Sequence, residues 1–190
     1  MSLPKHPQYK ATDSKLVAEV PKDWQLLPLR RLLPVIESGT SVNALDNQPE
    51  KGKPSVLKTS CVYTSRFRPE ECKEIVEEEL ERATCPVKKD SLIVSRMNTP
   101  DLVGAAGLAD SDIGHLYLPD RLWQVRIRGL LPAFAYYWTQ SKLYRDQVKA
   151  ACSGTSSSMQ NLSQEAFVSF FLCRPESGEQ NQIANFLDRE

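Results

Sequence analysis

The 190 residues are 41% apolar and 25% charged, a composition typical of a globular domain that can bury a sizeable core. No apolar run approaches the roughly 20 residues of a membrane-spanning helix, and the first fifteen residues lack the apolar stretch of a signal peptide, so we expect a cytoplasmic protein without a membrane partner. The formal net charge of zero, taken alone, argues against a nucleic-acid partner.

One segment carries much of the negative charge. Residues 70–81 (EECKEIVEEELE) contain seven glutamates and one lysine. The rest of the chain therefore has an excess of basic residues, and affinity for phosphates depends on where charges lie rather than on their total. The zero net charge leaves DNA binding open.

The five cysteines are odd in number, and no two of them form a CxxC pair. This usage is typical of reduced, mostly buried thiols in a reducing compartment. The only histidines are His6 and His115, so we expect no structural zinc site, and no cofactor is indicated.

The first half of the chain is predicted to be irregular. Residues 1–19 are polar and contain prolines, so we expect a poorly ordered tail, with the core beginning near Trp24. Residues 43–55 have the composition of a loop, and residues 56–63 are rich enough in β-branched and aromatic side chains to predict a strand. Proline at 69 followed by glutamates is typical of a helix start, so a mostly solvated helix is predicted from Pro69 to about Arg82.

The second half is more regular. Short strands are predicted over residues 90–95 and 121–129. Pro132 begins the clearest helix, whose aromatic residues recur at i, i+3, i+4 spacing and are expected to face the core, with Gly154 placed to end it. Ser163 can then cap a turn before a strand over residues 168–173.

The last residues, from 179 onward, favour a helix with one apolar face. Because that pattern stops in the middle of the face, it implies a partner or a longer chain. The candidate docking residues on it are Ile183, Phe186 and Leu187.

Motifs for catalysis are missing from the sequence. A Ser-His-Asp hydrolase would have to use His115, and there is no G-x-S-x-G sequence around any serine. There is also no P-loop, dinucleotide fingerprint, HExxH sequence or strand–Gly-rich-loop–helix unit of a methyltransferase. The sequence favours a binding domain rather than an enzyme.

Four polar segments punctuate the predicted strands, at 37–41, 64–68, 95–99 and 153–161. Each combines Arg, Asn, Gln, Ser or Thr with a turn, and these side chains suit DNA: Arg pairs with guanine, Asn and Gln pair with adenine, and hydroxyls bind bases or phosphates. Any one segment could equally be an ordinary loop. The candidate DNA-binding residues are Ser38, Thr40, Thr64, Arg66, Arg68, Ser95, Arg96, Asn98, Thr99, Thr155, Ser156, Ser158, Gln160 and Asn161.

Several segments together resemble one known family. They are VPKDWQLLPLRRLLPVIESGTS, VLKTSCVYTSRFRPEECK, DSLIVSRMNTPDLVG, LPDRLWQVRI, YYWTQSKLYRDQV, SGTSSSMQNLSQEAF and RPESGEQNQIANFLD. In their order and spacing, over residues 20–190, they are similar to a target recognition domain of a type I restriction–modification specificity subunit.

The resemblance implies an α+β fold with an irregular, twisted, β-helix-like sheet region and helices, ending in a helical hairpin or the start of a long spacer helix. It implies a tail over 1–19, the recognition domain over 20–175 and the beginning of the spacer helix over 176–190. A bacterial specificity subunit is not itself catalytic: it binds one half of a split target in double-stranded DNA and directs methyltransferase subunits and a restriction translocase. The methyltransferase, not this subunit, flips out the adenine for DNA methylation.

The sequence departs from a complete subunit in having one recognition domain and only the beginning of a spacer helix, as expected for a fragment or a half-length subunit. Two alternatives stay open: a protein-docking module within such a complex, and the recognition domain of a fused restriction–methylation enzyme. The DNA sequence bound does not transfer from the resemblance.

Within this hypothesis, the arginines at 66, 68 and 96 are expected to contact bases or phosphates. Asn98 and Gln160 are the candidate adenine contacts, and Ser156 and Ser158 the backbone anchors. The segment SGTSSSMQNLS (153–163) keeps two interpretations, a structural junction and a DNA-facing loop.

Overall fold

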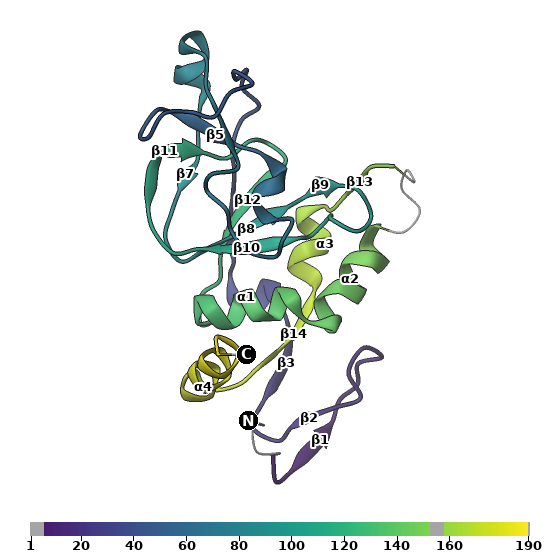
Figure 1. Cartoon of the computed structure of the whole chain (residues 1–190). Helices are drawn as coiled ribbons and strands as arrows, with labels where there is room; N and C mark the ends of the chain where they lie inside the picture. The colour runs from purple at the N-terminus through teal and green to yellow at the C-terminus, as the bar shows by residue number, and fades with distance from the viewer. Residues whose placement is uncertain (1–5, 153–157, 190) are drawn as a thin grey trace.

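The computed structural model of the chain describes residues 6–152 and 158–189 (Figure 1). These residues form an α+β fold with short strands in small sheets and a few helices, which confirms the predicted fold class. None of the described helices is both long and apolar enough to cross a membrane.

A four-stranded antiparallel sheet lies at the centre of the fold. Its order is β10 (Ala106–Ala109), β8 (Ser91–Ser95), β12 (Leu122–Arg126) and β4 (Val35–Ser38). β8 and β12 confirm the strands predicted at 90–95 and 121–129. Every residue of β8 is buried, because the sheet is covered on both faces.

Alternate residues of these strands supply two separate cores. Leu92 and Val94 of β8 face the helical side, whereas Ile93 between them joins a cluster with the second sheet. β12 divides in the same way, with Trp123 on the helical side and Leu122 on the other. This is the period-2 alternation of a pleated strand, and it places the sheet between two layers (Figure 1).

The second sheet has the order β6 (Cys72–Glu74), β5 (Ser55–Leu57), β11 (Ile113–Tyr117) and β7 (Pro86–Val87), with β11 and β5 parallel. The strand predicted at 56–63 is correct only at its beginning, because the chain turns after Leu57 into the 3-10 helix η2 (Thr59–Val62). That turn buries Cys61 and Val62 completely, which an extended strand with alternating faces would not do.

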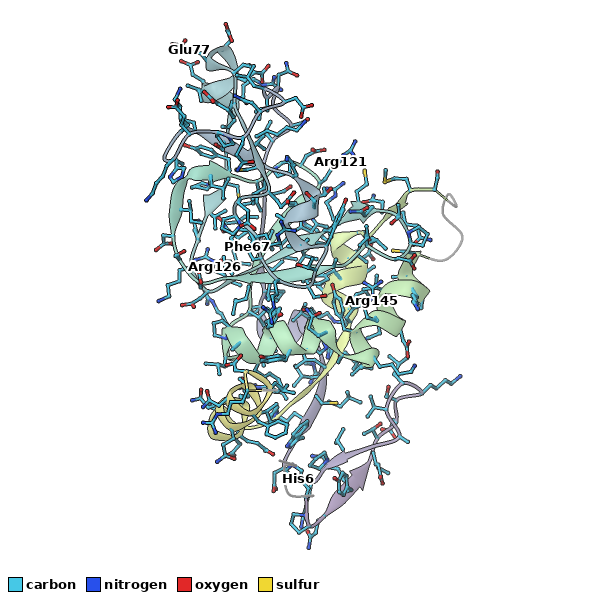
Figure 2. All side chains as sticks on the ribbon, in the orientation of Figure 1. His6, Phe67, Glu77, Arg121, Arg126 and Arg145 are labelled. Carbon is cyan, nitrogen blue, oxygen red and sulfur yellow. The ribbon has the colours of Figure 1, made fainter. Side chains whose placement is uncertain are left out.

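The helix predicted from Pro69 to Arg82 is wrong. The segment forms strand β6 and then the 3-10 helix η3 (Glu77–Arg82). Cys72 and Ile75 are both buried, and the backbone N–H of Ile75 donates to the Pro54 carbonyl at 3.0 Å. Pairing with β5 therefore outweighs the local helix signals, and only the glutamate-rich end extends outward as η3, with Glu77 at its tip (Figure 2).

Three two-stranded sheets complete the β-structure. β1 (Tyr9–Ala11) pairs with β2 (Glu19–Pro21), within the segment whose composition predicted poor order. β3 (Gln25–Pro28) pairs with β14 (Phe171–Arg174), and β9 (Met97–Asn98) pairs with β13 (Gln160–Asn161). The division into residues 1–19, 20–175 and 176–190 stays a prediction.

The single helix predicted from Pro132 is instead two helices. α1 (Pro132–Gln140) and α2 (Lys142–Cys152) are separated by Ser141, whose backbone is extended. The Ser141 hydroxyl donates to the Trp138 carbonyl at 2.7 Å and accepts from the Tyr144 N–H at 3.2 Å, so it satisfies the end of one helix and the start of the next. The expected C-cap, Gly154, lies outside the described residues.

The remaining helices are η1 (Leu29–Leu32), α3 (Gln164–Ser169) and α4 (Ser177–Leu187). Ser163 caps α3 as predicted, accepting from the Ala166 N–H at 3.1 Å. α3 occupies the first part of the strand predicted at 168–173, whose second part is β14. α4 confirms the helix predicted from residue 179.

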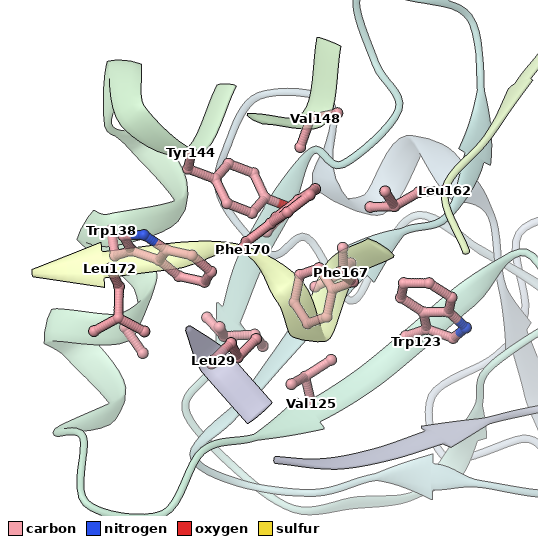
Figure 3. Close-up of a cluster of buried hydrophobic side chains, with 14 of the residues drawn as sticks. Leu29, Trp123, Val125, Trp138, Tyr144, Val148, Leu162, Phe167, Phe170 and Leu172 are labelled. Atoms are coloured by element: carbon pink, nitrogen blue, oxygen red, sulfur yellow. The ribbon is translucent and has the colours of Figure 1, made fainter. Parts of the chain in front are cut away.

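An aromatic cluster forms the centre of the larger core (Figure 3), and Trp138 and Tyr144 in it confirm that aromatic residues of the predicted helix region face the core. Its members are Trp123, Trp138, Tyr144, Phe167 and Phe170, which come from β12, α1, α2, α3 and the residue before β14. The ring centres of Trp138 and Tyr144 are 4.9 Å apart and those of Trp123 and Phe167 are 5.6 Å apart. Such pairs hold the helical layer to the central sheet.

Gly39, just after β4, packs directly against backbone. A Cβ at this position would lie 1.6 Å from the Leu118 carbonyl oxygen. Gly39→Ala should therefore lower the free energy of unfolding by about 1–3 kcal/mol, because backbone has to move, and urea denaturation measures this change. The control is Gly114→Ala, where no atom lies within 4 Å of the new Cβ. Equal denaturation midpoints for the two variants would contradict this packing.

Glu37 of β4 holds together three groups from other segments. Its carboxylate accepts from Lys88 Nζ at 2.8 Å, Arg126 Nη2 at 3.2 Å and the buried Gln124 Nε2 at 3.3 Å. The hydrogen bond from Lys88 lowers the pKa of Glu37 most; burial opposes it, and the other partners lower the pKa further.

A carboxylate whose pKa is lower in the folded state than its ordinary 4.5 stabilises the fold above that value and ceases to do so as pH falls through the folded pKa. When pH falls below 4.5, the free energy of unfolding of Glu37→Gln should therefore decrease by about 0.5–1 kcal/mol less than that of the wild type. Thermal denaturation over that pH range measures the difference, and parallel curves for variant and wild type would rule out the contribution.

Candidate DNA-recognition surface

Two of the predicted polar segments meet in the structure. Asn98 of β9 stands opposite Gln160 of β13, and Met97 stands opposite Asn161. The Leu162 N–H donates to the Arg96 carbonyl at 2.8 Å, and the Leu162 side chain is buried in the aromatic core. We call this pairing, residues 95–99 with 158–162, the β9–β13 junction. Thr155 and Ser156 lie outside the described residues.

Asn98 connects the β9–β13 junction to the end of η2. Its Nδ2 donates to the Tyr63 hydroxyl at 3.0 Å and to Ser95 Oγ at 3.1 Å, and its Oδ1 accepts from the Thr99 N–H at 2.9 Å. Asn98 is 6% exposed and Ser95 is fully buried. The amide predicted to contact adenine is thus engaged within the protein.

Side chains on the outside of the β9–β13 junction remain accessible. Thr99, Ser158 and Asn161 are exposed, and Gln160 is half-buried. Arg121 also lies here (Figure 2): it is exposed, and its carbonyl accepts from the Arg96 N–H at 3.0 Å. The accessible part of the β9–β13 junction therefore exposes amides and hydroxyls close to a cation.

Arg96 is half-buried rather than free at the surface. Its guanidinium carbon lies 5.8 Å from the centre of the buried Trp123 ring, a cation–π distance. Neither Arg96 Nε nor Trp123 Nε1 has a hydrogen-bond acceptor among the described residues. This arrangement keeps a positive charge beside the β9–β13 junction.

The segment 64–68 lies further along the surface and is held rigidly. Ser65 has a left-handed backbone (φ 61°), and its carbonyl accepts from the Tyr136 hydroxyl of α1 at 2.8 Å. The next residues cross β10 at Gly107, where a Cβ would lie 2.4 Å from the Phe67 nitrogen. A strained turn held this firmly by other elements is typical of a functional segment.

The two arginines of this segment differ in their surroundings. Arg66 is exposed, no carboxylate among the described residues forms an ion pair with it, and its charge lowers the pKa of Tyr136 against the larger opposing effect of burial. Arg68 pairs with Glu70 at 3.0 Å and Glu71 at 2.9 Å, and the hydrogen bond with Glu70 is the main cause of its raised pKa. Arg66 is therefore the freer cation. Thr64 beside them is exposed.

Within the segment 37–41, the hydroxyls of Ser38 and Thr40 are engaged internally. Ser38 Oγ lies 3.4 Å from the carbonyls of Asp120 and Leu122, and Thr40 Oγ1 is 2.8 Å from Thr84 Oγ1. Because β4, β12 and β8 are in register, Ser38 and Ser95 lie at the same end of the central sheet as the turn that carries Arg121. The segment supports that turn.

The predicted docking residues only partly form a free face. Ile183 packs against the larger core, with Ala184 buried beside it, whereas Phe186 is half-buried and Leu187 is 38% exposed. α4 packs against α1, and Tyr137 Oη of α1 donates to Asp188 Oδ1 at 2.5 Å (Figure 1). Part of the predicted apolar face is therefore satisfied within this domain.

Thiol and metal chemistry have little support in the described residues. Burial is the main cause of raised pKa values at Cys61, Cys72, Cys85 and Cys173, to about 11 at Cys85, which disfavours a reactive thiolate. Over residues 6–152 and 158–189, no three His, Cys, Asp or Glu side chains gather as a metal site.

The sequence alone did not point to Tyr63, Tyr136 or Arg121. Tyr63 belonged to a predicted strand, Tyr136 to a predicted helix and Arg121 to the start of another strand. The two tyrosines act through contacts with distant segments. Tyr63 contacts Asn98, 35 residues away along the chain, and Tyr136 contacts Ser65, 71 residues away. No local pattern signals such contacts.

Solved structures share this fold. No protein-family model matches the sequence, and no curated protein does. In structure, the chain matches specificity subunits of type I restriction–modification systems, which confirms the fold expected from the sequence resemblance.

Three of these neighbours illustrate the likeness. One comes from work on complex assembly and conformational transition of the type I R-M system, with 17% identity and a TM-score of 0.64 over 90% of this chain and 39% of that chain. The S subunit from M. genitalium has 16% identity and a TM-score of 0.60 over 87% and 38%. The HsdS subunit from Thermoanaerobacter tengcongensis has 14% identity and a TM-score of 0.61 over 95% and 39%. The chain thus spans about two fifths of the length of each neighbour.

The Tyr136–Ser65 hydrogen bond generates a local prediction. Tyr136→Phe removes this bond and should lower the free energy of unfolding by about 1 kcal/mol while freeing the turn at residues 64–68. Hydrogen exchange at the Arg68 amide, which donates to the Cys61 carbonyl at 2.8 Å, should accelerate. Tyr137→Phe is the matched control, because its hydroxyl contacts Asp188 instead. Unchanged exchange at Arg68 in Tyr136→Phe would show that the bond does not hold the turn.

Proposed function

We propose that the chain is a sequence-specific DNA-recognition domain that binds one half of a split double-stranded target for a type I restriction–modification complex. The β9–β13 junction is the observation that carries the proposal. It brings the exposed polar side chains of Thr99, Ser158 and Asn161 into one strand-pair region beside Arg121, on a fold shared with S subunits. Amides, hydroxyls and arginine at one place are the groups that bind base edges and phosphates.

The rigidity of the surface also supports this function. Specific DNA contacts need donors and acceptors held in register with base edges, and an ordered surface loses less entropy on binding. The β9–β13 junction is anchored by Leu162 in the core, and the turn carrying Arg66 is held by Tyr136 and Gly107. The backbone that carries Arg66 and Arg121 is thus held by contacts with other segments.

In this proposal the chain selects the DNA site and performs no chemical step itself. Methyltransferase subunits and a restriction translocase act on the selected DNA, in the cytoplasm where the DNA is accessible. The exposed Leu187 and half-buried Phe186 on α4 favour an additional docking role for this helix. Ile183 would contribute indirectly, because its packing against the core holds α4 in place.

The test of the function is selection of binding sites from randomised duplexes by the purified chain, with a methylation map of DNA from cells carrying the intact system. The proposal expects one short motif from selection and the same motif as one half of the methylated target. Exchanging this domain should change only that half. A chain that enriches no motif, or a map unaffected by the exchange, would overturn the function.

Single arginine variants separate phosphate contacts from base contacts. If Arg66 and Arg121 contact phosphates, Arg66→Ala and Arg121→Ala should each weaken binding to all sequences equally and lower the slope of log affinity against log salt by about one. A base contact would instead relax preference at one position, at a cost of about 1–3 kcal/mol. The control is Arg30→Ala, an exposed arginine on η1. Binding unchanged in both test variants would remove these residues from the interface.

A further inference from the structure

Tyr63 is the exposed aromatic side chain nearest the centre of the β9–β13 junction, and its hydroxyl is already engaged. It follows η2 directly and is 38% exposed. Its oxygen accepts from Asn98 Nδ2 at 3.0 Å and shares a second hydrogen bond with Thr59 Oγ1 at 2.8 Å. What the side chain offers to a ligand is therefore chiefly its apolar ring.

Asn98 is placed to hold Tyr63 rather than to contact DNA. Both of its amide hydrogens are directed to hydroxyls, on Tyr63 and Ser95, and its oxygen accepts from the Thr99 N–H. A bidentate contact with adenine needs the same Nδ2 and Oδ1 atoms. Since Asn98 is 6% exposed, such a contact would require breaking the internal bonds and exposing the side chain.

A second exposed apolar side chain belongs to the β9–β13 junction. Met159 is 43% exposed and directly precedes Gln160, which stands opposite Asn98. An apolar ring and a thioether thus flank the strand pair whose outer residues, such as Thr99 and Asn161, are polar. On the edges of base pairs, the apolar group in the major groove is the 5-methyl group of thymine.

Building on the proposed function, we propose that Tyr63 determines specificity by contacting the 5-methyl group of a thymine in the major groove, and that Asn98 is the positioning residue that fixes the ring. The two hydrogen bonds at the hydroxyl hold the ring in one orientation before DNA arrives. A side chain fixed in advance loses little entropy on binding, which favours selective contact over general attraction.

The first experiment repeats the selection from randomised duplexes with Tyr63→Ala, Asn98→Leu and Asn98→Asp. Tyr63→Ala and Asn98→Leu should lose preference for thymine at the same position of the motif. Asn98→Asp should retain it, because a carboxylate at this place can accept hydrogen bonds from Tyr63, Ser95 and the Thr99 N–H. The matched control is Tyr9→Ala, an exposed tyrosine of β1 at the opposite end of the molecule (Figure 1).

Asn98→Asp separates positioning from direct contact. If Asn98 itself paired with adenine, the carboxylate would abolish that preference and favour cytosine, whose N4 donates. A motif changed from adenine to cytosine by Asn98→Asp would therefore overturn the proposal, as would a motif unaffected by Tyr63→Ala. Tyr63 is exposed, so its variant keeps the test decisive even where Asn98→Leu does not fold.

The second experiment replaces each thymine of the enriched motif by uracil, which lacks only the methyl group. At one position the replacement should weaken wild-type binding about fourfold, the effect of one buried methyl, and leave Tyr63→Ala binding unchanged. Wild-type binding that is indifferent to uracil at every position would overturn the thymine contact. If the wild-type chain enriches no motif at all, the proposed function itself fails, whereas a motif insensitive to Tyr63 refutes this inference alone.

Discussion

The packing of Phe167 among four other aromatic rings is the interaction on which the rest of the structure depends. Phe167 is fully buried and lies within 6.5 Å, between ring centres, of Trp123, Trp138, Tyr144 and Phe170. These residues come from the central sheet and from three different helical or connecting segments. Because burying each large ring contributes a few kcal/mol and the pairs have specific geometry, the cluster fixes the helical layer on the sheet (Figure 3).

The candidate DNA-recognition surface is a consequence of that packing. Phe167 fixes α3, and the chain just before α3 passes through Leu162, which is buried in the same core. Leu162 in turn places Gln160 and Asn161 against β9. A strand pair of two residues on each side would be marginal alone, so its order derives from the core at one end and from the Asn98 network at the other.

The polar groups near this surface divide into those that build it and those that remain available. Asn98, Ser95 and Ser38 satisfy their hydrogen bonds within the protein, and Arg68 is neutralised by its own glutamates. Arg66 and Arg121 are exposed. The same residue types thus serve two purposes, and only their burial and partners distinguish a structural group from one that can meet a ligand.

The sequence by itself determined the two central strands, the aromatic helix region of the core and the Ser163 cap, because each depends on neighbours within a few positions. It also determined the α+β class and the polar segments from which a DNA-binding role was inferred, because these follow from residue types and from a resemblance in the order of the segments. It could not determine that residues 69–82 form a paired strand followed by a 3-10 helix, or that Ser141 divides one helix into two. Nor could it determine that Tyr63 contacts Asn98, 35 positions away. Those outcomes depend on contacts between distant segments, whose burial outweighs local propensity. For the same reason, only the tertiary structure decided that the Asn98 amide faces inward and that the Tyr63 ring faces outward.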